Sequence, residues 1–341
     1  MSRHATHIAQ PVTVSRVMLK VLAALLPGIA VSVYCFGPGV LVQLLLATLT
    51  ALGAEAAVLR LRQRPVAPAL ADLSAVVTAW LLALSMPPLG AWWMIVVATL
   101  FAIVLGKQLY GGLGNNPFNP AMVGFAVMIV SFPAQMAAWG TPLAALDATA
   151  QLQWIFTHTL PAGSSVDAVS SATPLDVLKT GLLQGGQDVA QLLLQPRFGQ
   201  WGNAGGEWVA LAWALGGLWL WQQKLIPWRT PLAMLAGVLA VSLPLWLWQP
   251  AHYASPLFHL LNGATLLAAG FIVTDPISGS TTPLGRLIFG FMVGVLVVVI
   301  RVFGGFPDAV AFAVLIMNMA VPFIDQTTQP RVFGRKGGRH A

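Results

Sequence analysis

The residues with the clearest chemical pattern lie in the run Asp167-Ala168-Val169-Ser170-Ser171-Ala172-Thr173-Pro174-Leu175-Asp176. Thr173 suits the N-cap of a helix, Pro174 suits the first helical position, and Asp176 stands where a capping box has its acidic member. The spacing predicts a short helix that begins after Thr173 and continues through Leu178. The free N–H groups and positive dipole end of such a helix also attract phosphate. The Thr173 hydroxyl therefore has two compatible uses, as a cap and as a phosphate attachment point.

Two other segments combine polar side chains with Gly and Pro, which prevent a regular helix. They are Gly111-Gly112-Leu113-Gly114-Asn115-Asn116-Pro117-Phe118-Asn119-Pro120 and Thr274-Asp275-Pro276-Ile277-Ser278-Gly279-Ser280-Thr281-Thr282-Pro283. Two interpretations stay open: cytoplasmic turns, or re-entrant backbone that lines a cofactor or ion site. In the second interpretation the Asp275 carboxylate binds a cation. The candidate residues for an ion or cofactor pathway are Asn116, Asn119, Thr274 and Asp275.

Other residues that could do chemistry have simpler interpretations. The single cysteine, Cys35, excludes an internal disulfide, a CxxC zinc site and a cysteine-held iron–sulfur cluster within this chain. His252 and His259 are interpreted as hydrogen-bonded residues near an interface. The acidic residues near span ends, interpreted as solvated or structural, are Glu55, Asp308 and Asp325.

The composition sets the environment of these residues. Of 341 residues, 57% are hydrophobic and 8% are charged, against about 45–50% and 25% in a soluble globular domain. This composition excludes an ordinary soluble enzyme and predicts an all-α polytopic membrane protein. The net charge of +7 is ascribed to cytoplasmic loops rather than to nucleic-acid binding, since no basic helix or aromatic-basic platform is present.

Apolar runs punctuated by Gly, Pro and charge predict about ten transmembrane helices of roughly 20 residues each. The expected spans are 17–36, 40–59, 72–88, 91–109, 121–138, 207–223, 231–249, 256–273, 284–303 and 308–325. The first has no signal-peptide cleavage site, so we expect it to stay in the mature chain. With the N-terminus in the cytoplasm, only Lys179, Arg197 and Arg301 of the 17 basic residues lie outside. Both termini are then cytoplasmic, and the long polar stretch 139–206 is on the outer side.

An internal repeat relates the two membrane parts. Pro88-Leu89-Gly90, Tyr110-Gly111-Gly112 and Phe125-Ala126-Val127-Met128-Ile129 are followed later by Pro283-Leu284-Gly285, Phe303-Gly304-Gly305 and Phe312-Ala313-Val314-Leu315-Ile316. Spans three to five thus match spans eight to ten. Because a shift of five spans is odd, the halves must cross the membrane in opposite directions. Inverted repeats of this kind often build transport folds whose sites lie between the halves.

Three motifs in order carry a family resemblance. Asp167-x-x-Ser170-Ser171-Ala172-Thr173 resembles the D-x-x-[ST]-[GS]-A-T signal at which a flavin transferase esterifies FMN to a threonine. The other motifs are the Gly-Asn-Pro run within 110–123 and the segment from Gly263-Ala264-Thr265 through Thr274-Asp275-Pro276 to Arg286. Over about residues 20 to 334 the chain resembles the family of D subunits of bacterial Rnf ion-translocating electron-transport complexes. B subunits of sodium-translocating NADH:quinone reductases are similar.

The resemblance implies a cofactor and a place for it. It implies FMN bound covalently through its phosphate to Thr173, with Asp167, Ser170, Ser171 and Ala172 as recognition elements for the flavin transferase. Ser171 stands where the family often has Gly, which is a mild departure. A second, non-covalent flavin such as riboflavin is also implied, without residues that place it.

The resemblance also implies partners and a location. Electrons would pass between a cytoplasmic donor and acceptor of the ferredoxin and NADH type, coupled to movement of Na+ or H+ across the bacterial inner membrane. Flavin and iron–sulfur subunits must assist, because this chain has neither a Rossmann fingerprint nor a cysteine cluster. The expected organisation is a first membrane half (1–138), a periplasmic loop with the attachment motif (139–206), a second membrane half (207–327) and a basic cytoplasmic tail (328–341).

Two other functions fit the composition and the repeat. One is a secondary transporter or channel without a redox role, for which ten spans in two inverted five-helix halves would serve equally well. The other is a membrane scaffold for partner subunits, which predicts that electron flow survives Thr173→Ala. The attachment motif argues against the transporter, since a plain transporter has no use for it.

Overall fold

The computed structural model describes residues 13–140, 146–160, 170–184, 186–306 and 308–330. Helices dominate this part of the chain, and five of them are at least 18 residues long and apolar enough to cross a membrane: α1, α2, α13, α16 and α17. Shorter apolar helices accompany them. The protein is therefore a polytopic all-α membrane protein.

The first half of the chain is built from apolar helices joined by short turns. Their buried faces share one hydrophobic core with the second half. The helices are α1 (Val14–Phe36), α2 (Gly39–Leu61), α3 (Val66–Leu70), α4 (Ser74–Ser85), α5 (Trp92–Phe101), its π-helical continuation η1 (Ala102–Gln108) and α6 (Pro120–Ser131).

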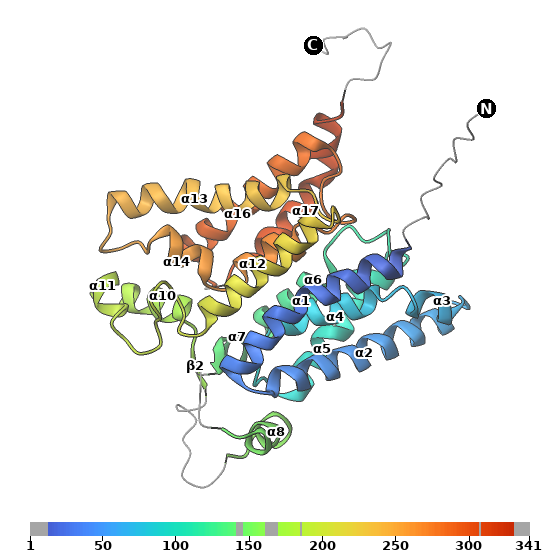
Figure 1. The fold of residues 1–341 in the computed structure, drawn as a ribbon, viewed down its shortest axis with the longest axis horizontal. Helices are drawn as coiled ribbons and strands as arrows, with labels where there is room; N and C mark the ends of the chain where they lie inside the picture. Colours follow the sequence, from blue (N-terminus) through green and yellow to red (C-terminus); the bar gives the residue numbers. More distant parts are fainter. Residues whose placement is uncertain (1–12, 141–145, 161–169, 185, 307, 331–341) are drawn as a thin grey trace, which may run out of the picture.

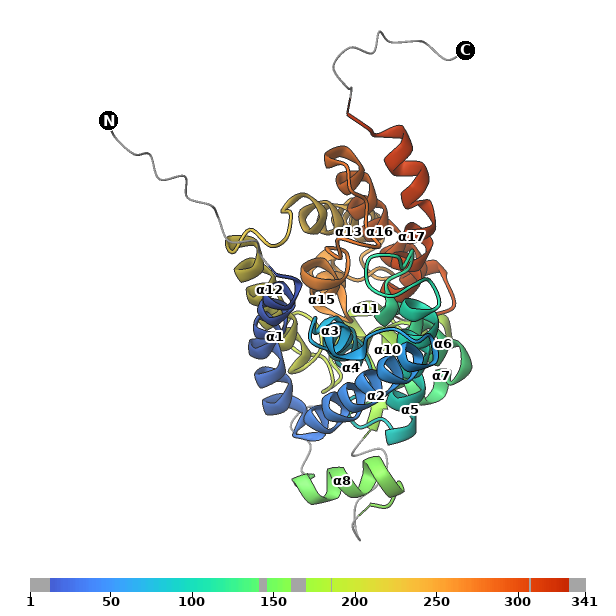
Figure 2. The ribbon, with the colours of Figure 1, turned by 90° about the vertical axis from the view of Figure 1, so that its right-hand side faces the viewer.

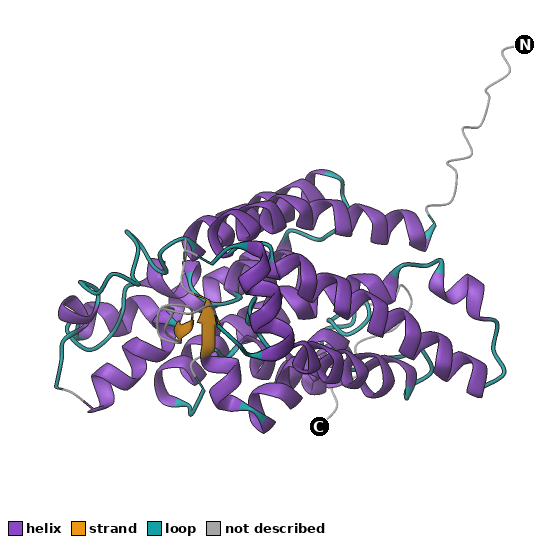
Figure 3. Cartoon of the chain, turned by 90° about the horizontal axis from the view of Figure 1, so that it is seen from below, coloured by secondary structure: helices purple, strands orange, loops and turns teal. Residues whose placement is uncertain are grey.

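The stretch between the halves contains more secondary structure than the single short helix predicted from its sequence. Its strands β1 (Ala138–Gly140) and β2 (Ser170–Ala172) pair antiparallel, with Ala138 opposite Ala172 (Figure 3). Its helices are α7 (Pro133–Ala137), α8 (Ala148–Thr157), α10 (Pro174–Gln184) and α11 (Val189–Leu192). Helix α8 lies at one end of the helical body (Figure 2), where the side chain of Gln151 accepts the Gly39 N–H at 2.8 Å.

The second half repeats the pattern of the first with one broken span. Its helices are α12 (Gly206–Gln222), α13 (Arg229–Trp248), α14 (Pro256–Leu261), α15 (Thr265–Leu267), the π-helix η2 (Ala268–Ile272), α16 (Pro283–Phe303) and α17 (Val310–Thr327). The most extensive contact within this half is between α13 and α16, which lie side by side (Figure 1).

Equivalent helices of the two halves meet in the middle of the molecule. Helices α1 and α12 pack together (Figures 1 and 2) and run antiparallel: Lys20 Nζ donates to Gln223 Oε1 at 2.9 Å, and at the other end Cys35 Sγ lies 3.6 Å from the Gly205 carbonyl oxygen. Helices α6 and α17 also pack together, and the Asn119 N–H donates to Asn318 Oδ1 at 3.0 Å. An inverted repeat would bring equivalent helices together in this way, and the repeat itself stays a prediction.

Three spans differ from their predicted extents. The fifth, expected to reach residue 138, ends at Ser131, because Pro133 starts the separate helix α7. The third occupies Ser74–Ser85 rather than 72–88. The eighth, expected as one helix over 256–273, is interrupted at Asn262, Gly263 and Ala264, where Gly263 has a φ of +63°. A positive φ is accessible to glycine at little cost.

Candidate functional site

Thr173 sits where strand β2 ends and helix α10 begins. Its Oγ1 accepts the Asp176 N–H at 3.1 Å and its carbonyl oxygen accepts the Val177 N–H at 2.9 Å. The predicted N-cap is therefore confirmed. The reciprocal capping bond from the Asp176 carboxylate is not formed among the described residues, and Asp176 lines a cavity instead.

That cavity has a volume of ≈ 290 Å³ and Thr173 is part of its wall. Its size is near the lower end of the roughly 300–1,000 Å³ typical of small-molecule sites. All three parts of the chain contribute to it, and most of the lining is apolar or aromatic. The wall includes Phe125 and Ile129 of α6, Trp139 of β1, Trp213 of α12, and Asn203, Asn262, Phe306 and Asp308 from loops.

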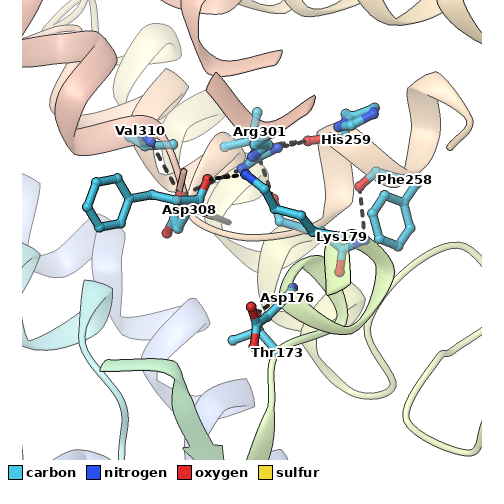
Figure 4. Close-up of polar contacts among 11 residues, drawn as sticks. Thr173, Asp176, Lys179, Phe258, His259, Arg301, Asp308 and Val310 are labelled. Atoms are coloured by element: carbon cyan, nitrogen blue, oxygen red, sulfur yellow. Dashed lines mark hydrogen bonds and ion pairs between the residues drawn. The ribbon is translucent and has the colours of Figure 1, made fainter. Parts of the chain in front are cut away.

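Helix α10 is fixed to the loop between α16 and α17 by Lys179. The Lys179 ammonium donates to the carbonyl oxygen of Gly304 and lies 3.5 Å from that of Phe306. Burial lowers the pKa of Lys179 below its ordinary value of 10.5, while the nearby Asp176 carboxylate acts in the opposite direction. Lys179 thus holds the helix that begins at Thr173 against the second membrane half (Figure 4).

Arg301, near the C-terminus of α16, is a functional candidate that the sequence did not single out. Its side chain is 2% exposed, and it reaches the break between α14 and α15. The guanidinium donates to the carbonyl oxygens of His259 at 2.7 Å and Asn262 at 3.0 Å, and to Thr265 Oγ1 at 2.9 Å. A basic residue inside the apolar run 287–303 was the available signal, since a charge in such a run is costly and marks function or structure.

A second cavity, of ≈ 130 Å³, lies between the two membrane halves. Its lining brings together all four pathway candidates, Asn116, Asn119, Thr274 and Asp275. Their segments are turns between helices, and residues of both segments line this cavity. The Asp275 carboxylate accepts the Ile277 N–H at 3.2 Å and the Ser278 hydroxyl at 2.7 Å. A role in ion movement stays a prediction.

Glu55 is buried rather than solvated. The side chains of Glu55 and Lys107 are both 2% exposed, and Lys107 Nζ lies 2.6 Å from Glu55 Oε1. Lys107 also donates to Ser74 Oγ at 2.7 Å, and Gln108 Nε2 donates to Glu55 Oε1 at 2.7 Å. Burial of a charge requires such partners. Of the two interpretations of Glu55, solvated or structural, the structure therefore supports the structural one.

The remaining motif residues are only partly within the described chain. Ser171 and Ala172 form β2 with the backbone of Ser170, and Ser171 lies opposite Trp139. Asp167 lies outside the described residues. Within the described ranges, no group of three or more His, Cys, Asp or Glu residues is arranged to hold a metal ion.

Comparison with known proteins places the chain among relatives that match along nearly all of its length. The family model described as "NQR2, RnfD, RnfE family" matches residues 1–334. The chain belongs to this family. A relative from Escherichia fergusonii, named as the D subunit of an ion-translocating oxidoreductase complex, is 51% identical over 336 residues, covering 95% of each chain.

Other members of the NQR2, RnfD, RnfE family give the same picture. A relative from Yersinia pseudotuberculosis is 51% identical and one from Salmonella typhimurium is 52% identical, again over 336 residues and 95% of each chain. Both are likewise named as D subunits of ion-translocating oxidoreductase complexes.

Proposed function

We propose that this chain is the flavin-carrying membrane subunit of an Rnf-type ion-translocating oxidoreductase complex, with FMN esterified to Thr173. The observation that carries the proposal is the position of the Thr173 hydroxyl, at the start of α10 and in the wall of a cavity formed by both membrane halves. A threonine that served only as a cap would not need a cavity beside it.

The residues around Thr173 fit an FMN phosphate and an aromatic ring system. The first-turn N–H groups of α10 and its positive dipole end favour a phosphate on Thr173. Trp139, Trp213 and Phe125 provide apolar surface, and the amides of Asn203 and Asn262 provide polar contacts. A flavin bound there would supply one- and two-electron redox chemistry, and the protein would position it, limit its access to water and tune its potential.

The proposed place in the membrane follows from the distribution of charge. With the basic loops in the cytoplasm, the stretch that carries Thr173 is periplasmic and the complex lies in the bacterial inner membrane. Electrons exchanged with a cytoplasmic donor and acceptor of the ferredoxin and NADH type would have to cross the membrane through partner subunits that hold flavins and iron–sulfur clusters. That crossing is the step that can be coupled to Na+ or H+ movement.

The cavity between the halves is the proposed location of the ion or cofactor pathway. Asn116, Asn119, Thr274 and Asp275 bring amide, hydroxyl and carboxylate oxygens to it from both halves. Oxygen ligands of this kind suit Na+, and a carboxylate can also carry a proton. A non-covalent riboflavin remains part of the proposal without assigned residues.

Mass spectrometry tests the attachment directly. We expect the full chain, co-expressed with a flavin transferase, to gain the mass of FMN minus water and to give a fluorescent band in a denaturing gel. Thr173→Ala should lose both signals, whereas Thr173→Ser keeps a hydroxyl at the same position and should retain at least part of them. Absence of an adduct from the wild-type chain in the presence of an active transferase would contradict the proposal and favour a transporter without a redox role.

A further inference from the structure

A buried charge lies directly behind the cavity wall that faces Thr173. Through its bonds to His259, Asn262 and Thr265, Arg301 fixes the non-helical turn 262–264. Asn262, Gly263 and Ala264 of this turn line the same cavity as Thr173. The guanidinium therefore holds part of the cavity wall in place from behind.

At Gly263 the guanidinium lies against the backbone of the cavity wall, beside the Leu175 side chain. A Cβ atom added to Gly263 would lie 2.7 Å from Arg301 Nη2 and 3.4 Å from Asp308 Oδ1. The absence of a side chain at this position brings both charged groups close to the interior of the cavity. Because the surroundings are buried and largely apolar, their fields are weakly screened by water and salt.

Asp308 contributes the opposite charge at the cavity surface itself. Its Oδ1 lies 3.9 Å from Arg301 Nη2 and accepts the Val310 N–H at 3.3 Å. The Asp308 side chain is 20% exposed, against 2% for Arg301, and Asp308 is part of the lining. Figure 4 shows the two side chains facing each other above Thr173. The cavity thus has one positive and one negative group with different environments.

We propose that Arg301 and Asp308 set the reduction potential of the redox group attached at Thr173, with Arg301 favouring the reduced form and Asp308 opposing it. This inference rests on the proposed function. Each electron delivered by a partner subunit adds one negative charge to the group unless a proton follows. A nearby positive charge lowers the free energy of that reduced form, and a nearby negative charge raises it.

A similar cluster at the opposite end of the molecule provides a control. In the repeat, Gly111-Gly112 matches Gly304-Gly305. Lys107 lies four residues before the first pair and Arg301 three residues before the second, so the two cations stand at neighbouring positions of the repeat. Each of these cations bonds a hydroxyl at the start of a helix, Ser74 for Lys107 and Thr265 for Arg301. The Lys107 cluster is far from Thr173 in the inverted arrangement, and replacing it should leave the potential of a group at Thr173 unchanged.

The experiment compares the reduction potential of the flavin in full-length chains that differ by a single charged side chain. Wild type, Arg301→Gln, Arg301→Lys and Asp308→Asn are co-expressed with a flavin transferase, checked for the covalent adduct by mass, and titrated spectroelectrochemically. We expect Arg301→Gln to shift the reduction equilibrium at least tenfold toward the oxidised form, about 59 mV for a one-electron couple. Asp308→Asn should shift it toward the reduced form, and Arg301→Lys should retain most of the wild-type value. The control is the double variant Glu55→Gln with Lys107→Met.

The opposite signs distinguish this role from a purely structural one. Shifts in the same direction for Arg301→Gln and Asp308→Asn, or no shift in chains that carry the adduct, would overturn the inference. If Arg301→Gln does not fold, Asp308→Asn decides, because Asn can still accept the Val310 N–H and only the charge is lost. A wild-type chain without an adduct would instead overturn the proposed function.

Discussion

Charged side chains inside the apolar body of this protein are held in small hydrogen-bonded clusters. Lys107, Glu55 and Ser74 form one cluster, and Arg301 with Thr265 and two backbone carbonyl groups forms another. A buried charge without partners costs several kcal/mol, so these clusters determine which single substitutions the fold can tolerate. Arg301 differs from Lys107 in that its surroundings border the Thr173 cavity.

The Lys107 and Glu55 pair should show strong coupling in stability. Lys107→Met leaves the Glu55 carboxylate buried and without its cation, which should lower the free energy of unfolding by about 3–5 kcal/mol. Glu55→Gln with Lys107→Met removes both charges and should lower it less than Lys107→Met does. Denaturation of the full chain in detergent, followed by circular dichroism, measures the difference. A loss of unfolding free energy in the double variant as large as that in Lys107→Met, or larger, would contradict this coupling.

At the Thr173 site, sequence reasoning succeeded where the signal was local. The cap at Thr173 follows from residues within four positions of each other, and the structure confirms it. The Arg301 cluster could not be predicted in this way, because its partners His259, Asn262 and Thr265 lie 36 to 42 residues away in the chain. Contacts of that range depend on how the helices pack, which composition does not specify.

Among the helices, close approach depends on glycine at specific positions. On α16, a Cβ added to Gly294 would lie 2.0 Å from the Met234 carbonyl oxygen of α13, and one added to Gly290 would lie 2.4 Å from that of Thr230. Small residues allow helix backbones to approach closely in membranes, where apolar burial alone gives little driving force. The contact between α13 and α16 therefore depends on the four-residue spacing of Gly290 and Gly294.

Gly294→Leu should separate α13 from α16. A side chain cannot fit against the α13 backbone, and we expect overpacking to cost at least about 1–3 kcal/mol. Gly53→Leu on α2 is the matched control, because nothing lies within 4 Å of a Cβ at that position. The melting temperature and the monodisperse fraction in detergent should fall for Gly294→Leu and stay near wild type for Gly53→Leu. Equal behaviour of the two variants would contradict this account of the interface.

The limits of a helix could be predicted from the sequence where its hydropathy is continuous. The prediction failed where a short turn interrupts an apolar run. The spans that became α1, α2, α13, α16 and α17 were expected within a few residues of their observed limits. The break at 262–264 was missed, although Asn262-Gly263 is a dipeptide typical of turns. The run 256–273 is apolar enough to conceal it. This break matters for function because it forms part of the cavity beside Thr173.

For the whole molecule, two contacts join the two halves: α1 packs antiparallel to α12, and α6 packs against α17. The two charged clusters lie at opposite ends. Lys107 lies at the end that contains the connection between α2 and α3, since Arg62 Nη1 of that connection donates to the Gln108 carbonyl oxygen at 2.8 Å. Arg301 lies at the end that contains α10, to which Lys179 ties the α16–α17 loop. A group attached to Thr173 and the cavity lined by Asn116 and Asp275 therefore lie toward opposite ends of the membrane helices.

Labelling of introduced cysteines should show which end faces the cytoplasm. The native Cys35 is buried and should react little with a membrane-impermeant maleimide in intact cells. Gln153→Cys on α8 and Gln63→Cys after α2 both replace exposed residues. Whether each introduced cysteine reacts in intact cells therefore depends on which side of the membrane it faces. Because the basic residues near Arg60, Arg62 and Arg64 favour the cytoplasm, Gln153→Cys should react in intact cells and Gln63→Cys only after permeabilisation. The reverse pattern would place Thr173 in the cytoplasm and remove the need for electrons to cross the membrane to reach it.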